Sequence, residues 1–404
     1  MEKNITKFLN PKSIAVVGAS NTQGKVGYIL MEKLQKFKGN VIPVNIREKA
    51  IFGKKAYKSV LEIPKKVDLV IIATPNFTVK DILEDCGKKG IKNVIVISAG
   101  FAEVKNYRMQ EEIINTIKKY KINILGPNCF GVANPYLNLD ATFSNTSSKK
   151  GKIAFIAQSG ALWSYLSDFP NIKFSGYISL GNMADLDFVD FIKYFDKDKN
   201  TKKIVLYIEK LKNGREFIQV CKKSKKQIIA VKAGSSKRGS KMAVSHTASL
   251  ATDYSVYKGA FKQAGVKLVD SLAKAVGLKQ EQIITKIKKT DKVIIITNAG
   301  GAGTLLTDYF ENKNINVIKV TDLLGTATAR AYKKELSKKI YKKIDKIIVI
   351  LTPQKMSEPE KVAKEIIKSK YRKKIIACFL GNKSVKEAVK KLRTSDVPVF
   401  TQCC

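Results

Sequence analysis

The most distinctive chemistry in the sequence belongs to His246, the single histidine among 404 residues. It lies in the stretch KAGSSKRGSKMAVSHTASL, whose small, polar, glycine-bearing composition predicts a mobile loop, the kind of segment on which chemistry is often sited. Ser245, Thr247 and Ser249 surround it with hydroxyl groups. An imidazole is a competent nucleophile near neutral pH, so His246 is a candidate catalytic residue, with an ordinary packed or solvated histidine as the alternative. A serine hydrolase is disfavoured because the sequence has no GxSxG motif.

Two further segments could support chemistry at an imidazole. Glu209 follows the apolar run IVLYI, and a carboxylate at a strand end can accept a ring N–H and orient the ring, although taken by itself an ordinary surface glutamate explains it better. Ser159, Gly160 and Ala161 follow another apolar run and open the helical pattern ALWSYLSDF. Ser159 is a good N-cap residue, and the small residues leave backbone N–H groups open. This stretch therefore predicts an anion cradle, with a purely structural helix cap as the alternative.

Near the N-terminus, the sequence suggests a site for a phosphorylated nucleotide. Gly18, Ala19 and Ser20 end the first apolar run, where small residues let backbone N–H groups approach a phosphate; because GASNTQGKVG is not a clean GxGxxG, a plain tight turn is the alternative. Asn45 and Arg47 end the second run, with Glu48 after them. A dinucleotide enzyme would place an acidic residue near there for the ribose. Arg47 instead favours a phosphorylated nucleotide such as 3′-phospho-ADP, the nucleotide half of CoA.

The elements that must position these residues form a repeated α/β pattern. Short β-branched runs alternate with longer amphipathic stretches, as expected for parallel strands that feed helices. The first set predicts strands at residues 13–17, 41–44, 68–73, 93–97 and 122–125. The stretch after Gly126 is irregular, and NTSSKKG, ending at Gly151, marks a boundary. Two more α/β sets follow, so we expect doubly wound domains at 1–130, 151–285 and 290–404, with sites at the carboxyl ends of their strands.

Composition excludes several classes of function. The formal net charge is +41, but only seven of the 75 basic residues are arginine and the lysines are scattered, which disfavours a nucleic-acid partner. No stretch has the roughly 18 continuous apolar residues that span a membrane, and the N-terminus lacks the apolar run of a signal peptide. We therefore expect a cytoplasmic protein with no membrane partner. The six cysteines show no metal-ligand spacing, and no metal site is expected.

Taken together and in order, the motifs resemble one family. GAS, PVNIRE, ISAGFAE, GPNCFG, AQSGALW, YIEKLKNGREF, KAGSSKRG and SHTASLA are similar to motifs of the nucleoside-diphosphate-forming acyl-CoA synthetases, which include ADP-forming acetyl-CoA synthetase and succinyl-CoA synthetase. The resemblance covers nearly the whole chain. The third-domain stretches TNAGGAGTLLTDYFE and ILTPQKMSEPEKVA resemble the acetyl-CoA-type alpha subunit rather than the succinyl-CoA alpha subunit, which lacks that domain. The fold expected from the resemblance is a Rossmann-like CoA-binding domain followed by two flavodoxin-like domains.

The resemblance implies a role for each motif. His246 matches the phosphorylated histidine, and Glu209 matches the acid that orients it. The phosphate cradle matches Ser159, Gly160 and Ala161. CoA is implied as the substrate of the first domain, with nucleotide and pantetheine contacts at Gly18, Ala19, Ser20, Asn45 and Arg47 and the thiol end near Ser98, Ala99, Gly100 and Asn128. In the family, acyl-CoA, phosphate and ADP are interconverted with acid, CoA and ATP through acyl phosphate and phosphohistidine.

The sequence departs from the family in three places. Ile46 and Arg47 stand where members often have Pro and Lys, and Ala248 replaces a frequent Gly. More importantly, no ATP-grasp region is recognisable, so ATP or ADP and Mg²⁺ are expected on a separate ATP-grasp beta-type subunit. The glycine-rich turn at residues 298–303 is an alternative nucleotide site, although a tight strand-to-helix turn explains it better. The competing function is a non-catalytic CoA or acyl-CoA sensor or scaffold on the same fold.

Overall fold

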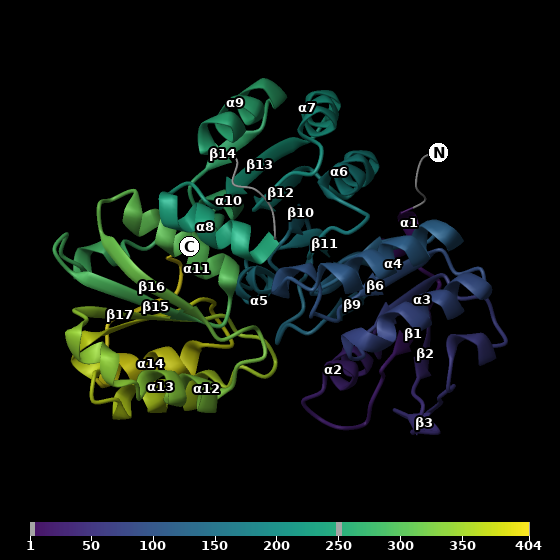
Figure 1. The fold of residues 1–404 in the computed structure, drawn as a ribbon, viewed down its shortest axis with the longest axis horizontal. Coiled ribbons are helices and arrows are strands. Elements are labelled where there is room, and N and C mark those ends of the chain that lie inside the picture. The colour runs from purple at the N-terminus through teal and green to yellow at the C-terminus, as the bar shows by residue number, and fades with distance from the viewer. Residues whose placement is uncertain (1–4, 248–252, 404) are drawn as a thin grey trace.

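The structure is a computed structural model that describes residues 5–247 and 253–403, without the side chains of residues 244–247. It is an α/β protein with three main sheets, as the sequence predicts. Figure 1 shows the teal elements of the second sheet between the purple-to-blue N-terminal part and the green-to-yellow C-terminal part. Within the described ranges, no helix is long and apolar enough to cross a membrane.

The first sheet has the strand order β2-β1-β5-β6-β7, and all its pairs are parallel. Its strands coincide closely with the predicted runs: β1 (Ser13–Val17), β2 (Asn40–Val44), β5 (Leu69–Ile72), β6 (Asn93–Val96) and β7 (Asn123–Leu125). The strand LVII of β5 is buried throughout, as expected when helices cover both faces of a parallel sheet. The main connecting helices are α2 (Val26–Leu34), α3 (Val79–Lys88) and α4 (Tyr107–Tyr120).

The second sheet has the order β14-β13-β12-β10-β11-β8-β9. Its five parallel strands are β10 (Lys150–Ala157), β11 (Phe174–Ser179), β12 (Lys203–Ile208), β13 (Gln227–Lys232) and β14 (Lys267–Val269). Its other two strands, β8 (Gly131–Asn134) and β9 (Leu139–Thr142), are antiparallel and lie where the sequence predicts irregular chain. That prediction was wrong because the hairpin is stabilised by pairing with β11, a partner distant in sequence. Helices of this part include α5 (Ala161–Ser167), α6 (Phe188–Lys197), α7 (Gly214–Lys223) and α9 (Tyr254–Ala264).

The third sheet is parallel and has the order β16-β15-β17-β18-β19. Its strands are β15 (Lys292–Thr297), β16 (Asn316–Asp322), β17 (Lys346–Leu351), β18 (Ile375–Phe379) and β19 (Val399–Phe400). The sequence analysis did not anticipate the edge strand β16, which is half exposed and carries polar residues. The main helices are α11 (Gly300–Glu311), α12 (Ala329–Leu336), α13 (Pro359–Lys368) and α14 (Lys386–Thr394).

The sheets share hydrophobic cores rather than standing apart. One buried cluster joins Ile14 and Leu30 of the first part to Ile156 of the second. Another joins Trp163 of the second part to Ile348 of the third. The second sheet therefore packs against both neighbours, which brings the carboxyl ends of strands from all three parts together.

Candidate functional site

A cavity of about 750 Å³ lies where the three parts of the chain meet. The first part lines it with Ser98 and Asn128, and the second with Gln158 and Ser159. The third part contributes residues around Asn298. Ligand sites in open α/β folds lie at the carboxyl ends of the strands, and these residues follow β6, β7, β10 and β15.

Eight of the predicted site residues line this one cavity, although they come from four separate motifs. They are Ser98, Ala99, Gly100, Asn128, Ser159, Gly160, Ala161 and Glu209. The other CoA-site predictions, at Gly18, Ala19, Ser20, Asn45 and Arg47, do not line this cavity. Gly18 nevertheless packs directly against the cavity wall: a Cβ added to it would lie 2.7 Å from the carbonyl oxygen of Ala73, which lines the cavity.

The Gly18 turn is tied to the turn after β2. Gly18 has a φ of +87°, a conformation that favours glycine. The Asn45 side chain donates to the Ala19 carbonyl at 2.7 Å and accepts from the backbone N–H of Arg47 at 2.7 Å. Ser20 is buried, and its hydroxyl donates to Glu48 at 3.2 Å. Arg47 itself is exposed, so its guanidinium is accessible to a ligand phosphate.

The predicted thiol-end residues form a compact backbone turn at the cavity. The Ser98 hydroxyl donates to the Thr74 carbonyl at 2.6 Å, and the Ser98 carbonyl accepts from the Asn128 N–H at 2.9 Å. Gly100 has a φ of +105°, and a Cβ there would lie 2.3 Å from Nδ2 of Asn76. These contacts fix the polar wall of the cavity on the side of the first sheet.

Helix α5 begins at the cavity, but not in the way the sequence predicts. Its N-cap is Gly160, with no side-chain capping hydrogen bond, so the prediction that Ser159 caps the helix was wrong. Ser159 instead lies against the first turn of α11, where a Cβ added to Gly301 would be 2.5 Å from the Ser159 Oγ. Ser159 therefore packs against α11 and does not cap α5.

The start of α11 lies at the same cavity, a position beside the predicted phosphate cradle that sequence reasoning did not anticipate. Asn298, Ala299 and Gly300 line the cavity, and the N-cap Ala299 makes no side-chain capping hydrogen bond. The sequence predicts a tight strand-to-helix turn for this glycine-rich segment, with a nucleotide site as the alternative. The first-turn N–H groups of a helix have no partner within the helix itself, and such a helix start can bind an anion. The starts of α5 and α11 therefore converge on one cavity.

Glu209 is held rigidly at the end of β12 and is mostly buried. Its backbone N–H donates to Oε1 of Gln158 at 2.6 Å. The Tyr207 hydroxyl lies 3.2 Å from Oε1 of Glu209 and 3.3 Å from the carbonyl oxygen of Gly301. A fixed carboxylate thus stands beside the two helix starts.

The backbone of His246 lies in α8 (Lys237–Thr247), whereas the sequence predicts a loop there. Its side chain lies outside the described residues. Helix α8 packs against α11, and the two lie side by side in Figure 1. Asp308 of α11 accepts hydrogen bonds from the backbone N–H of Gly234 at 2.7 Å and of Ser236 at 2.8 Å. The polar composition of this segment predicts a loop. The segment is helical because hydrogen bonds to α11, a helix distant in sequence, hold the residues just before α8 in place.

Lys232, at the end of β13, adds a buried positive charge near this site. It is paired in register with Ile208, the residue before Glu209, and its ammonium lies 4.3 Å from the centroid of the Tyr257 ring. Burial lowers the pKa of the Lys232 ammonium to about 8, partly offset by the charges of Asp308 and Glu209.

We expect this lysine to make stability depend on pH. Below pH 8 the folded and unfolded chains both carry the proton, and the folded chain bears the full cost of burying the charge. As the pH rises from about 8 towards 10.5, the folded chain loses the proton first and gains stability. Between pH 7 and pH 10, the free energy of unfolding of the wild type should rise relative to Lys232→Met by ~2 kcal/mol, measured by denaturant unfolding. Lys222→Met, at an exposed site on α7, is the control: the difference in free energy of unfolding between it and the wild type should not change with pH. If both differences changed equally with pH, the assignment to Lys232 would be contradicted.

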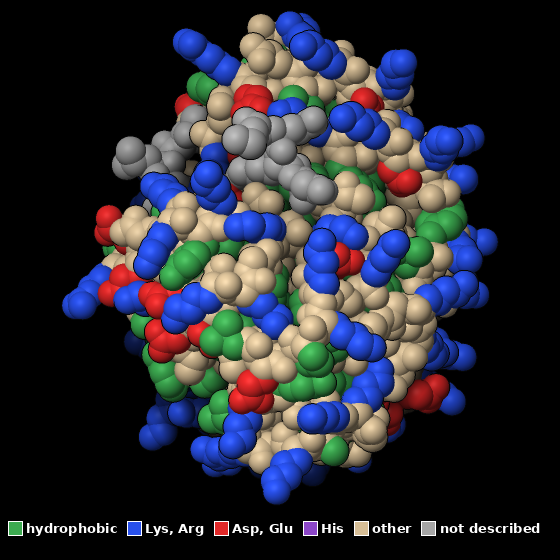
Figure 2. Space-filling model, turned by 90° about the vertical axis from the view of Figure 1, so that its right-hand side faces the viewer, with side chains coloured by type: hydrophobic (Ala, Val, Ile, Leu, Met, Phe, Trp, Pro, Cys, Tyr) green, Lys and Arg blue, Asp and Glu red, His purple; other side chains and the backbone are tan. Residues whose placement is uncertain are grey.

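Lysine and arginine side chains are spread over the face of the molecule shown in Figure 2, among scattered acidic and apolar groups. This distribution gives a general attraction for acidic ligands.

Two family models match the chain. A CoA binding domain matches residues 12–135, and a succinyl-CoA ligase like flavodoxin domain matches residues 150–280. The chain therefore combines a CoA binding domain with a succinyl-CoA ligase like flavodoxin domain, in the order that the fold shows.

Similar proteins that match most of the chain identify the family more specifically. The chain is 36% identical to subunit alpha of ADP-forming acetate–CoA ligase I from Pyrococcus furiosus, with 99% of this chain and 95% of that one covered. It is 45% identical to subunit alpha of ligase II from the same organism, with 78% and 70% covered. A Ca. Korarchaeum cryptofilum acetyl-coenzyme A synthetase 1, solved with phosphate and ADP, has a TM-score of 0.66 at 32% identity, covering 99% of this chain and 94% of that chain. The chain belongs to the family of ADP-forming acetate–CoA ligases, which confirms the resemblance found in the sequence.

Some relatives are longer. The chain is 44% identical to an ADP-forming acetate–CoA ligase from Methanocaldococcus jannaschii and spans 44% of its length.

Proposed function

We propose that the chain is the CoA-binding, phosphohistidine-carrying subunit of an ADP-forming acyl-CoA synthetase, acting on a small organic acid and CoA in the cytoplasm. We assign CoA binding to residues 1–130, the carrier histidine to 151–285, and a supporting flavodoxin-like domain to 290–404. The observation that carries the proposal is the cavity that the predicted thiol-end turn, two uncapped helix starts and Glu209 all line.

The reaction proceeds in three balanced steps. An oxygen of inorganic phosphate attacks the thioester carbonyl of acyl-CoA, the C–S bond breaks, and CoA leaves as its thiolate. A nitrogen of His246 then attacks phosphorus, the bond from phosphorus to the acyl oxygen breaks, and the carboxylate of the acid leaves. The phosphohistidine finally transfers its phosphoryl group to ADP, which forms ATP and restores the imidazole. CoA is thus a substrate, and Mg²⁺ is bound with the nucleotide.

The chain's own groups act on charge and position. Backbone N–H groups at the starts of α5 and α11 stabilise the negative charge spread over the phosphoryl oxygens while bonds to phosphorus are exchanged. Glu209 accepts the N–H of the other ring nitrogen and favours the imidazolium character that develops during transfer. The Ser98–Gly100 turn and Asn128 hold the thioester end of CoA, while the Gly18 turn, Asn45 and Arg47 hold its nucleotide.

A nucleotide-binding partner completes the cycle. We assign ADP, ATP and Mg²⁺ to an ATP-grasp beta-type subunit, because relatives of this chain are named alpha subunits. The test is to incubate the purified chain with Mg²⁺ and radiolabelled ATP, with and without a matching ATP-grasp subunit. Label should enter the protein only with the partner. Stoichiometric labelling of the chain alone would contradict the assignment and move the nucleotide site to residues 298–303. No turnover with the partner, despite CoA binding, would favour a sensor or scaffold.

Arg47→Glu should weaken CoA binding. Loss of a charge-assisted contact to phosphate costs about 1.5–3 kcal/mol, so the dissociation constant should rise ~10–100-fold, and the introduced carboxylate adds repulsion. Isothermal titration calorimetry with CoA measures this directly. Arg372→Glu, an exposed charge reversal in the third part of the chain, is the matched control. If Arg47→Glu bound CoA as tightly as Arg372→Glu does, the nucleotide of CoA would have to bind elsewhere.

A further inference from the structure

Helix α2 connects the Gly18 turn of the predicted CoA site to the second sheet. It packs on β9 of the second sheet, and their apolar residues belong to one buried cluster that includes Leu30, Leu34, Leu139 and Ala141. Apolar contacts are non-directional, so such an interface alone does not fix how far a helix slides along its partner.

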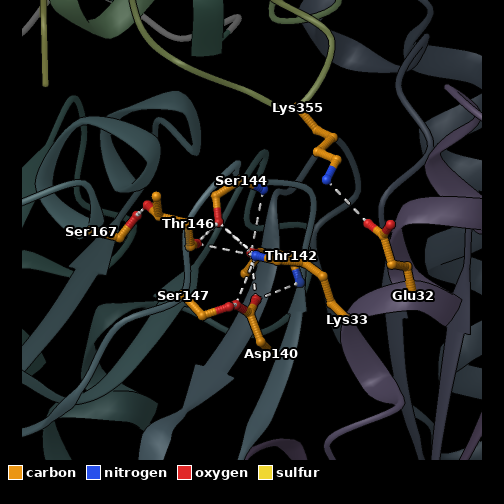
Figure 3. Close-up of polar contacts among 9 residues, drawn as sticks. All are labelled: Glu32, Lys33, Asp140, Thr142, Ser144, Thr146, Ser147, Ser167 and Lys355. Carbon is orange, nitrogen blue, oxygen red and sulfur yellow. Dashed lines mark hydrogen bonds and ion pairs between the residues drawn. The ribbon is translucent and has the colours of Figure 1, made fainter. Parts of the chain in front are cut away.

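A buried lysine supplies directional contacts at this interface (Figure 3). Lys33 of α2 has a side chain only 9% exposed. Its Nζ lies 2.7 Å from Oδ2 of Asp140 and 2.9 Å from Oγ of Ser144. The carbonyl oxygen of Thr146 and Oγ1 of Thr142 complete the set, at 3.2 Å and 3.3 Å. One ammonium from the first part of the chain therefore meets four oxygen atoms of the second.

The acceptors are themselves fixed. Asp140 accepts from the Thr142 hydroxyl at 2.6 Å and from the Ser147 hydroxyl at 2.5 Å. The Ser144 hydroxyl donates to the Thr146 carbonyl at 2.6 Å. Lys33 thus enters a preformed polar site in residues 140–147 rather than gathering flexible groups around itself.

The same helix end also meets the third part of the chain. Glu32 pairs with Lys355 at 3.3 Å, as Figure 3 shows. Ser144 forms an isolated β-bridge with Gln354, and Oε1 of Gln354 accepts from Nδ2 of Asn298 at 2.9 Å. Asn298 lines the cavity, as does Phe143, the residue before Ser144. Ser144, which accepts from Lys33, is thus next to the cavity-lining Phe143 in sequence and is linked through Gln354 to the cavity-lining Asn298.

The opposite end of α2 reaches the predicted CoA turn. Val26, the first residue of α2, lines the cavity. A Cβ added to Gly27 would lie 1.8 Å from the carbonyl oxygen of Gly18, so helix and turn are in direct backbone contact. The helix is roughly 13 Å long and rigid, so any shift at Lys33 is passed on to the Gly18 turn.

We propose that Lys33 is a positioning residue for CoA binding: its contacts with Asp140 and Ser144 fix α2 on β9 and so hold the Gly18 turn in register with the cavity. The inference rests on the proposed function, because CoA is the ligand whose placement it controls. A buried ion pair contributes little net stability compared with apolar residues of similar size, whereas its geometry favours one arrangement of the groups around it.

The test separates positioning from stability. Lys33→Met leaves Asp140 buried without its cation, so both the melting temperature and the CoA affinity should fall. In Lys33→Met/Asp140→Leu the charge is removed on both sides, so the melting temperature should return close to the wild-type value. CoA affinity should remain roughly tenfold below wild type, because the directional contacts are still missing. Thr142→Val keeps the shape but removes one acceptor of Lys33 and one donor to Asp140; it is a milder variant and should weaken CoA binding less.

The matched control is Lys193→Met, which breaks the exposed ion pair of Lys193 with Glu216 on α6 and α7 and should leave CoA affinity unchanged. Calorimetric titration gives the CoA affinity, and scanning calorimetry gives the melting temperature. Wild-type CoA affinity in both the double variant and Thr142→Val would overturn the proposal and leave Lys33 a structural residue. A wild-type chain that binds no CoA would contradict the proposed function instead, so the two failures are distinguishable.

Discussion

His246→Ala is expected to abolish acyl-CoA synthesis while CoA still binds with wild-type affinity. The substitution removes the only imidazole in the chain, so neither the nucleophile that takes the phosphoryl group nor an alternative histidine remains. Loss of a covalent carrier should lower kcat by about 10⁴-fold or more. The predicted CoA contacts lie in the first part of the chain and stay intact. Turnover is measured with the ATP-grasp partner, and CoA affinity by calorimetry on the chain alone.

Retained CoA binding is the internal control for folding in that variant. If His246→Ala, assembled with its partner, still turned over at a substantial fraction of the wild-type rate, another nucleophile would be required and the carrier mechanism would fail.

Gly301→Val should cause the second largest loss. A Cβ at this position would lie 2.5 Å from Oγ and 2.6 Å from Cβ of Ser159, and 2.9 Å from the Tyr207 hydroxyl. The added side chain must therefore push α11 away from α5 and separate the two helix starts. Because loss of one preorganised donor to a developing oxyanion costs about 10²–10³-fold, we expect kcat to fall by at least ~100-fold with CoA affinity unchanged.

Gly214→Val is the matched control, because a Cβ added to Gly214 at the start of α7 meets no atom within 4 Å. That variant should retain its activity. If Gly301→Val had the kcat of this control, the convergence of α5 and α11 would have no part in phosphate transfer.

Much of the fold could be predicted because its strands carry their signal locally. Runs such as LVII in β5 and KVIIIT in β15 are buried nearly throughout, and only a strand covered on both faces by helices suits them. The fold class and the family were predicted on this basis and on the order of the motifs, and both are confirmed.

The errors lie where distant parts of the chain decide local structure. The β8–β9 hairpin depends on pairing with β11, and the start of α8 depends on a hydrogen bond from Ser236 to Asp308 of α11, 72 residues further along the chain. Neither interaction leaves a periodic signal in the segment itself.

The candidate site was predicted in pieces. Strand ends and small residues indicated Glu209 and the residues from Ser159 to Ala161, and the cavity brings these together. The sequence alone did not predict that α11 contributes to the site, because a glycine-rich turn that binds a ligand looks the same in sequence as one that only packs closely. Only the contact between Gly301 and Ser159 distinguishes its place beside α5. The roles of the site residues, His246 above all, stay predictions.

The most direct test of the central claim, that His246 carries phosphate, needs neither nucleotide nor partner. The purified chain is incubated with acetyl-CoA and radiolabelled inorganic phosphate, and the released CoA and the protein-bound label are both measured. We predict a small amount of label that is labile in acid, stable in base, located by peptide mapping at His246, matched by released CoA and acetate, and absent from His246→Ala. Release of CoA with no label on the protein, or label on any other residue, would contradict the account.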